Sequence, residues 1–206
     1  DWVAVGESLW QVLEASQRIA QLSDGAFDAT LGSCVRLWRR AARQGELPSA
    51  EKIAAAKTAS GWTSLHMNET SHQIRISQSG LSLDLGGIAK GFALDEALHT
   101  LQTFGILSAL VDGGGDVAVS NPPPGRDGWK VMLSEGTWDG ADYLILANEA
   151  LATSGDRYQK VILQGVSYSH IIDPATGLVL TQSRAASVRA KSAMEADAWA
   201  SALCVM

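Results

Sequence analysis

The chain has 206 residues, and 46% of them are hydrophobic, enough to bury a substantial core; we expect one domain over residues 1–206, with two lobes as the alternative. Its formal net charge of −6, without a block of lysine and arginine, argues against nucleic acid or an anionic membrane as its main partner. Cys34 and Cys204 lie far apart and outside any CxxC pair, so a zinc or redox site is not expected and a disulfide is left open.

Helical periodicity dominates the chain up to about residue 60. One helix is expected to end at the turn of residues 23–25, and two more are expected over 35–43 and 49–59. The basic cluster of residues 36–43 is interrupted by apolar residues, which indicates the solvated face of a helix rather than a binding patch. The first helix would bury a stripe formed by Leu9, Val12, Leu13, Ser16, Ile19 and Ala20.

After Trp62 the pattern changes to short alternating segments that are typical of strands. We therefore predict an α+β fold with mixed or antiparallel sheets packed against helices, in which a helical part of about residues 1–60 precedes a mixed part of about residues 61–206. The strands are expected at residues 64–67, 73–77, 81–85, 107–112, 116–120, 129–133, 143–148, 151–154, 161–163, 167–172 and 185–190.

The segment SLDLGGIAKGFALDEAL, residues 82–98, reads as a buried strand that stops at Gly86-Gly87 and turns into a helix near Ile88. A helix start offers unpaired N–H groups and partial positive charge, and glycines let a ligand approach the backbone. With Asp84 and Lys90 flanking this turn, the sequence predicts a phosphate or metal-phosphate site. The helix would bury a stripe of Ile88, Phe92, Ala97, Leu98, Leu101 and Phe104.

Four other motifs are weak when taken singly. Gly113-Gly-Gly115 lacks the following helix that a dinucleotide-binding turn requires, so it is either a plain hairpin or a backbone surface near a ligand. Residues 173–177 have good turn chemistry, and His170 on the strand before them is either structural or a proton carrier. Residues 153–156 are expected to form a turn. In residues 25–30, an exposed Phe27 would either stack on a flat ring or pack beside Asp28.

Ser192 and Glu195 form a capping box that opens a last helix to about residue 205. Within it, Asp197 and Ser201 are one turn apart and share a face. A carboxylate and a hydroxyl are a fair half-site for Mg²⁺, although a surface Asp and a small packing Ser would look the same.

The order of these motifs along the chain is more specific than any one of them. GAFDATLG, LDLGGIAKGFALDEA, LVDGGGDV, ATSGD, HIIDPATG and ADAWASAL together resemble the ApbE-like FAD:protein FMN transferases from Gly25 onward. The resemblance implies Mg²⁺-dependent transfer of FMN from FAD to a Thr or Ser hydroxyl of a partner redox protein, with release of AMP. It implies a metal bound by the Gly87 carbonyl, Asp197 and Ser201, and His170 as the candidate base. FAD would be bound along Ala26, Phe27, Asp28, Asp84, Lys90, Ile172 and Ala200.

Two departures and two alternatives accompany the resemblance. Ser201 stands where the family usually has Thr, and it lacks the methyl group that restricts the rotamer; Ala29 stands where the family has Pro. The sequence is also expected to lack a segment that precedes the first helix in relatives, through which a full-length protein would be tethered to a membrane outside the cytoplasm. The alternatives are an FAD pyrophosphatase that yields FMN and AMP, and a non-catalytic flavin-binding protein.

Overall fold

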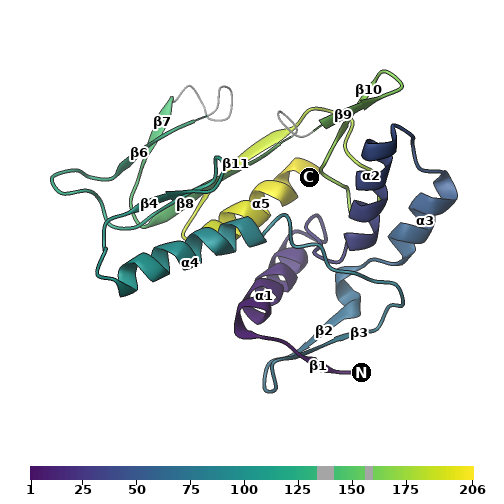
Figure 1. Cartoon of the computed structure of the whole chain (residues 1–206), viewed down its shortest axis with the longest axis horizontal. Helices are drawn as coiled ribbons and strands as arrows, with labels where there is room; N and C mark the ends of the chain where they lie inside the picture. The colour runs from purple at the N-terminus through teal and green to yellow at the C-terminus, as the bar shows by residue number, and fades with distance from the viewer. Residues whose placement is uncertain (134–141, 156–159) are drawn as a thin grey trace. The chain divides into compact units, whose positions relative to one another are not determined.

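The computed structural model describes residues 1–133, 142–155 and 160–206, and the chain divides into two compact units (Figure 1). Unit 1 contains Asp1–Leu85, Gly155–Arg184 and Ala202–Met206, whereas unit 2 contains Gly86–Ser154 and Ala185–Ser201. Both units combine helices with antiparallel strands, so the predicted α+β class is confirmed.

The helices of unit 1 follow the predicted periodicity closely. They are α1 (Glu7–Leu22), α2 (Gly32–Gln44) and α3 (Ala50–Thr58), and a short 3-10 turn follows at Trp62–Ser64. Every residue of the predicted α1 stripe except Leu9 is fully buried, and Leu9 is partly buried against the same core. The arginines of α2 point to solvent, which confirms that the basic cluster is an exposed helix face.

Unit 1 also holds a three-stranded sheet and a hairpin. The sheet has the order β1 (Val3–Ala4), β3 (Gln73–Ile76), β2 (Leu65–Asn68), with Met67 opposite Ile74. The two-residue β1 was not predicted, because two residues carry no periodicity. β9 (Lys160–Leu163) pairs with β10 (Val166–Ser169) in antiparallel register. Trp10 and Leu13 of α1 pack against Leu65 and Ile74 of the sheet.

Three predicted strands differ most from the structure: one is absent and two are shorter than expected. Residues 81–85 form no strand but a single parallel bridge, Leu31↔Ser82, because only two of their backbone groups pair with the 29–32 segment. The strand expected over 107–112 is only three residues long, and the exposed Leu107 lies outside it. The strand expected over 167–172 ends at Ser169, so His170 follows the strand instead of lying on it.

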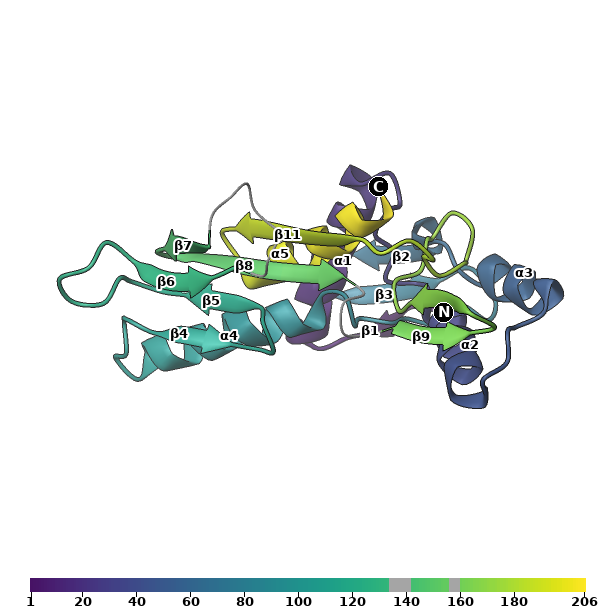
Figure 2. The same cartoon turned by 90° about the horizontal axis from the view of Figure 1, so that it is seen from above.

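Unit 2 is built on a four-stranded sheet of order β11-β8-β5-β4, seen from above in Figure 2. Its strands are β4 (Leu110–Asp112), β5 (Val117–Val119), β8 (Glu149–Gly155, whose last residue belongs to unit 1) and β11 (Ala185–Ala190). The helices α4 (Ala89–Thr103) and α5 (Ala193–Val205) cover one face. A hairpin of β6 (Trp129–Met132) and β7 (Tyr143–Leu146) completes the unit.

The period-2 alternation of the central strands decides what packs on each face of this sheet. Ala118, Ala150 and Ala152 point to α4 and α5, where they meet other small residues such as Ala196 and Ala200. Val117, Val119 and Leu151 point the other way and pack against Val131 and Leu146 of the β6–β7 hairpin. Small side chains on the helix face allow the helices to approach the sheet backbone closely.

The apolar stripe predicted for α4 is only partly correct. Ile88, which caps the helix, is 0% exposed, but Phe104 at the other end is 79% exposed. The fully buried positions within α4 are Gly91 and Leu94.

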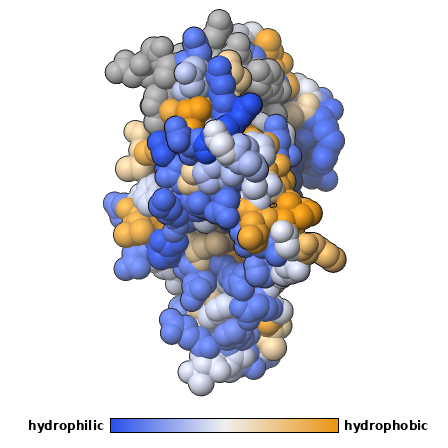
Figure 3. Space-filling model, turned by 90° about the vertical axis from the view of Figure 1, so that its left-hand side faces the viewer, coloured by the Kyte–Doolittle hydropathy of each residue, from blue (hydrophilic) through white to orange (hydrophobic). Residues whose placement is uncertain are grey.

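On the face shown in Figure 3, apolar side chains appear as separate patches among hydrophilic ones. No helix among the described residues is long and apolar enough to cross a membrane.

Candidate functional site

The first turn of α4 lies directly against the first turn of α5. Gly91 makes this possible, since a Cβ there would collide with the backbone of Ala193 and come within 2.7 Å of the Met194 Cα. From the next turn of α4, Asp95 accepts hydrogen bonds from the backbone N–H groups of Ala193 (2.8 Å) and Met194 (2.9 Å). Ser192 also accepts from the Glu195 N–H (3.1 Å), which confirms the predicted cap of α5. These contacts fix the helix turn that carries Asp197.

Asp197 is the buried carboxylate at the centre of this contact, with only 3% of the residue exposed. Its Oδ2 accepts a hydrogen bond from the Gly91 backbone N–H at 3.0 Å, over a sequence separation of 106 residues. Burial raises the pKa of Asp197 from its usual 3.8 to about 6; the Gly91 bond and the Lys90 charge oppose the rise, whereas the Asp116 carboxylate adds to it. One of the N–H groups at the start of α4, predicted to face an anion, thus binds a carboxylate of the protein itself.

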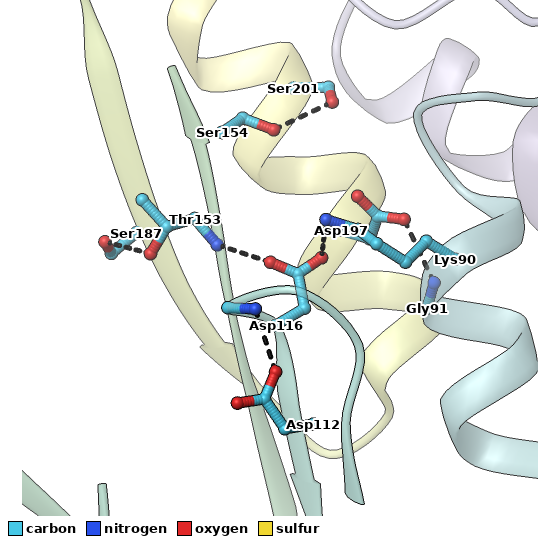
Figure 4. A network of polar contacts seen from close by, with 10 residues as sticks. Lys90, Gly91, Asp112, Asp116, Thr153, Ser154, Ser187, Asp197 and Ser201 are labelled. Atoms are coloured by element: carbon cyan, nitrogen blue, oxygen red, sulfur yellow. Dashed lines mark hydrogen bonds and ion pairs between the residues drawn. The ribbon is translucent and has the colours of Figure 1, made fainter. Parts of the chain in front are cut away.

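Lys90, the residue before Gly91, forms an ion pair with Asp116 at the start of β5 (Figure 4). The Lys90 Nζ is 2.6 Å from the Asp116 Oδ2, and the Asp116 side chain is 2% exposed whereas that of Lys90 is 42% exposed. The other carboxylate oxygen of Asp116 accepts from the Thr153 backbone N–H on β8 at 3.0 Å. One lysine therefore lies near both buried carboxylates.

Hydroxyl groups continue this polar network along β8 and α5. Ser201 Oγ is 3.1 Å from Ser154 Oγ, and Thr153 Oγ1 is 2.7 Å from Ser187 Oγ on β11. Thr153, Ser154 and Gly155 lie within β8, so the strand predicted over 151–154 is confirmed and the turn expected at 153–156 is wrong for these three residues; Asp156 falls outside the described residues. Asp197 and Ser201 share one face of α5 as predicted, and Figure 4 shows Ser201 paired with Ser154 there.

The donors in unit 2 suit a hard cation such as Mg²⁺. Asp197 offers a carboxylate whose burial disfavours its charge, a condition that a bound cation would relieve. Ser201 adds a hydroxyl one turn later, and Gly87 precedes α4 by two residues, close in sequence to the Gly91–Asp197 contact. Within the described residues no group of three or more His, Cys, Asp and Glu side chains is placed to hold a metal. A cation here would therefore depend on hydroxyl and backbone oxygens besides one carboxylate.

Ala200, another residue that the resemblance assigns to FAD binding, also lies in unit 2. It is 0% exposed and packs in the core between the helices and the sheet. Its methyl group supports the packing of α5, and neither its side chain nor its backbone is exposed in this structure.

In unit 1, the predicted FAD residues of the 26–30 segment are largely engaged in the fold. Asp28 accepts hydrogen bonds from the backbone N–H groups of Thr30 (2.7 Å) and Trp62 (3.2 Å), and from the Thr30 hydroxyl (2.6 Å). Burial raises the pKa of Asp28, against the effect of these bonds. Phe27 is 6% exposed, so of the two alternatives left open for it, stacking on a ligand or packing, the structure shows packing. Ala26 is partly exposed at the same turn.

The other unit 1 candidates lie beside this segment or near it. The Asp84 N–H donates to the Ala29 carbonyl at 2.9 Å, which brings Asp84 next to the 26–30 turn, and Arg39 approaches the Asp84 carboxylate at 3.5 Å. Ile172 is buried with Leu31 in one apolar cluster. The structure thus brings these segments together within unit 1.

His170 is exposed and lies three residues before the tight turn of residues 173–177. The turn is confirmed: Asp173 accepts from the Ala175 N–H (2.8 Å) and the Thr176 hydroxyl (2.9 Å), and Gly177 has a φ of +72°. Gly113-Gly-Gly115 is likewise a hairpin turn between β4 and β5, with no helix after it. Neither cysteine forms a disulfide in the described chain, and both are buried.

Sequence reasoning missed the functional interest of Asp95, Asp116 and Ser154. Asp116 directly follows the three glycines, and an acidic residue after such a turn is ordinary turn chemistry, so nothing local marked it. Its pairing with Lys90 arises only when β5 packs beside α4.

The chain belongs to the ApbE family, whose sequence profile matches residues 1–206. Among curated proteins, the FAD:protein FMN transferase of Chlamydia muridarum is 32% identical over 205 residues, which are 98% of this chain and 63% of that protein. The FAD:protein FMN transferase of Treponema pallidum is 30% identical over 221 residues, covering 99% of this chain and 61% of that protein. The chain therefore spans about three-fifths of the length of these relatives.

Solved structures agree with the family assignment. The ApbE protein of Thermotoga maritima superposes with a TM-score of 0.89 at 34% identity, covering 100% of this chain and 68% of that one. The flavinyl transferase ApbE of Pseudomonas stutzeri, in its apo form, gives a TM-score of 0.85 at 28% identity, covering 100% and 65%. The predicted family is confirmed.

Proposed function

We propose that this protein transfers FMN from FAD to a Thr or Ser hydroxyl of an acceptor protein and releases AMP. The observation that carries the proposal is the contact between the first turn of α4 and Asp197, because it gathers a lysine and a hard-oxygen donor set beside a glycine-rich helix start. Curated relatives named FAD:protein FMN transferase at 30–32% identity support the same reaction.

In this reaction the acceptor hydroxyl oxygen would attack the phosphorus of the FMN half of FAD. A bond forms between that oxygen and phosphorus, the diphosphate bond breaks, and AMP leaves with the electron pair. Phosphoryl transfer depends mainly on positioning and charge neutralisation. Lys90 would supply a cation to the diphosphate, while Asp197, Ser201 and the Gly87 carbonyl would hold Mg²⁺. When bound, Mg²⁺ would stabilise negative charge on the phosphoryl oxygens.

We assign to His170 the removal of the proton from the acceptor hydroxyl. Its exposed position beside a well-ordered turn supports access to a protein substrate. Ala26, Phe27, Asp28, Asp84 and Ile172 belong to the proposed FAD-binding segments, and the packing of Asp28 and Phe27 suggests that they shape the backbone there more than they touch the ligand. We also propose that the protein works outside the cytoplasm.

The test is incubation of the chain with FAD, Mg²⁺ and a candidate acceptor protein, followed by mass spectrometry. A covalent FMN adduct on the acceptor supports transfer, whereas free FMN and AMP without adduct would indicate a pyrophosphatase. FAD binding without AMP release under any divalent metal would indicate a non-catalytic flavin-binding protein.

Two variants test the residue roles within that assay. His170→Ala should slow FMN transfer while leaving FAD binding intact, and unchanged turnover would remove His170 from the mechanism. Asp197→Ala should abolish both activity and the response to Mg²⁺. An active variant that still requires Mg²⁺ would refute the metal assignment.

A further inference from the structure

The Lys90–Asp116 pair combines an accessible cation with an inaccessible anion. The lysine side chain is 42% exposed, and the aspartate side chain is 2% exposed, with Nζ and Oδ2 2.6 Å apart. We propose that Asp116 is a positioning residue that holds the Lys90 ammonium in place to receive the diphosphate of the substrate. The inference rests on the proposed function and extends it to a residue outside the predicted binding set.

Asp116 is itself held from several sides, so it is a rigid support. Its Oδ1 accepts from the Thr153 N–H on β8 at 3.0 Å, and its backbone carbonyl accepts from the Gly113 N–H at 2.8 Å. Asp112 closes the same turn by accepting from the Gly115 N–H at 2.8 Å (Figure 4). The fixed carboxylate of Asp116 therefore determines the position of the flexible Lys90 ammonium group.

The geometry leaves the lysine able to bind a second anion. The contact with Asp116 Oδ2 is an ion pair without hydrogen-bond geometry, so the N–H donors of the ammonium group remain available to phosphate oxygens. The four-carbon stem of a lysine has many rotamers, and a ligand would otherwise have to overcome this entropy when it orders the side chain. Asp116 orders it in advance, so that less free energy is lost on binding.

The arrangement also explains why an anion can bind beside two buried carboxylates. Asp116 and Asp197 would each repel a diphosphate, and Lys90 offsets both charges from one position. A purely structural ion pair would stabilise the fold without affecting ligand affinity, and this is the difference that an experiment can detect.

The experiment measures FAD dissociation constants with Mg²⁺ by isothermal titration, together with thermal midpoints without ligand. Asp116→Asn is the main variant, since it removes the negative charge that holds Lys90, while the amide oxygen can still accept from the Thr153 N–H. Asp112→Asn is the matched control, because it makes the same change on the same hairpin without touching Lys90. Lys90→Met and the double variant with Asp116→Asn complete a cycle. Inorganic pyrophosphate serves as a second probe that lacks the flavin.

We expect Asp116→Asn to weaken FAD and pyrophosphate binding about tenfold, because the ligand must then order the Lys90 side chain itself. Asp112→Asn should bind both as the unchanged protein does. Asp116→Asn should cost little further affinity once Lys90 is Met, because its effect passes through the lysine. Without ligand, Lys90→Met should lower the thermal midpoint by leaving a buried carboxylate uncompensated, and the double variant should recover it.

Two results would overturn the role of Asp116: FAD affinity unchanged in Asp116→Asn, or an equal loss in the presence and absence of Lys90. If Asp116→Asn does not fold, Asp116→Ser keeps an acceptor for the Thr153 N–H and is read in the same way. Failure of the proposed function is seen separately, because it shows as a missing FMN adduct on the acceptor protein, whereas the role of Asp116 is read from FAD and pyrophosphate affinities alone. An unchanged protein that binds neither probe would overturn both.

Discussion

Gly91→Ala is expected to separate α4 from α5, although alanine is the better helix former. The added Cβ would meet the backbone of Ala193 and lie 2.7 Å from the Met194 Cα, and backbone atoms cannot rotate away as the end of a side chain can. The helices must therefore move apart, which stretches the 3.0 Å bond from the Gly91 N–H to Asp197.

The magnitude follows from three effects. Overpacking of a core costs about 1–3 kcal/mol, and loss of a hydrogen bond to a charged group about 1.5–3 kcal/mol. Higher helix propensity offsets about 1 kcal/mol of this. The net loss in the free energy of unfolding is then about 1.5–5 kcal/mol, or a decrease of roughly 10 °C in the thermal midpoint.

Urea unfolding monitored by circular dichroism, in the presence of a chelator, measures this loss. Ala93→Gly is the control, since Ala93 lies on the exposed side of the same helix and its substitution should cost only about 1 kcal/mol of propensity. If Gly91→Ala were as stable as the unchanged protein, or more stable, the close approach of the two helices would be refuted.

Three further predictions concern the same unit. The pKa of Asp197 is about 6 in the folded chain, against an ordinary 3.8, so the folded state binds the proton more tightly than the unfolded state does. Protonation of Asp197 therefore stabilises the fold fully below about pH 4, and this contribution is lost as the pH rises through about 6. Metal-free Asp197→Asn should therefore gain stability relative to the unchanged protein between pH 4 and 6.5 in thermal unfolding, and parallel curves would contradict this. Ser154→Ala should weaken Mg²⁺ binding about three- to tenfold in calorimetry, because the Ser201 hydroxyl loses the partner that orients it. Adding Ser201→Thr should restore the Mg²⁺ affinity, because the methyl group of threonine restricts the rotamer. A double variant without restored affinity would count against the role of Ser154 in orienting Ser201. Asp95→Ala should lower the free energy of unfolding by about 1–2 kcal/mol by removing the acceptor for two N–H groups of α5, and urea curves unchanged by the substitution would show that water replaces it.

Much of the fold was predictable because the signals are local. The stripe of α1, the start of α4 just after Ile88 and the Ser192 cap of α5 depend on residues within one or two turns of each other. Residues 81–85 were misread as a strand because an alternating pattern indicates a half-buried extended segment but not whether a partner runs beside it. The sequence could not decide between stacking and packing for Phe27 for a related reason, since burial depends on what the rest of the chain places around it.

For the candidate site too, local features could be read from the sequence and long-range contacts could not. The sequence by itself determined the family, the shared face of Asp197 and Ser201, and the glycine-rich start of α4, because each of these is a matter of residue order and helical spacing. Only the tertiary structure decided that Asp197 binds the Gly91 N–H, that Ser154 meets Ser201 and that Lys90 pairs with Asp116. These pairings join distant parts of the chain, and they form because small residues let the helices pack closely on the sheet, where a buried charge or hydroxyl needs a partner.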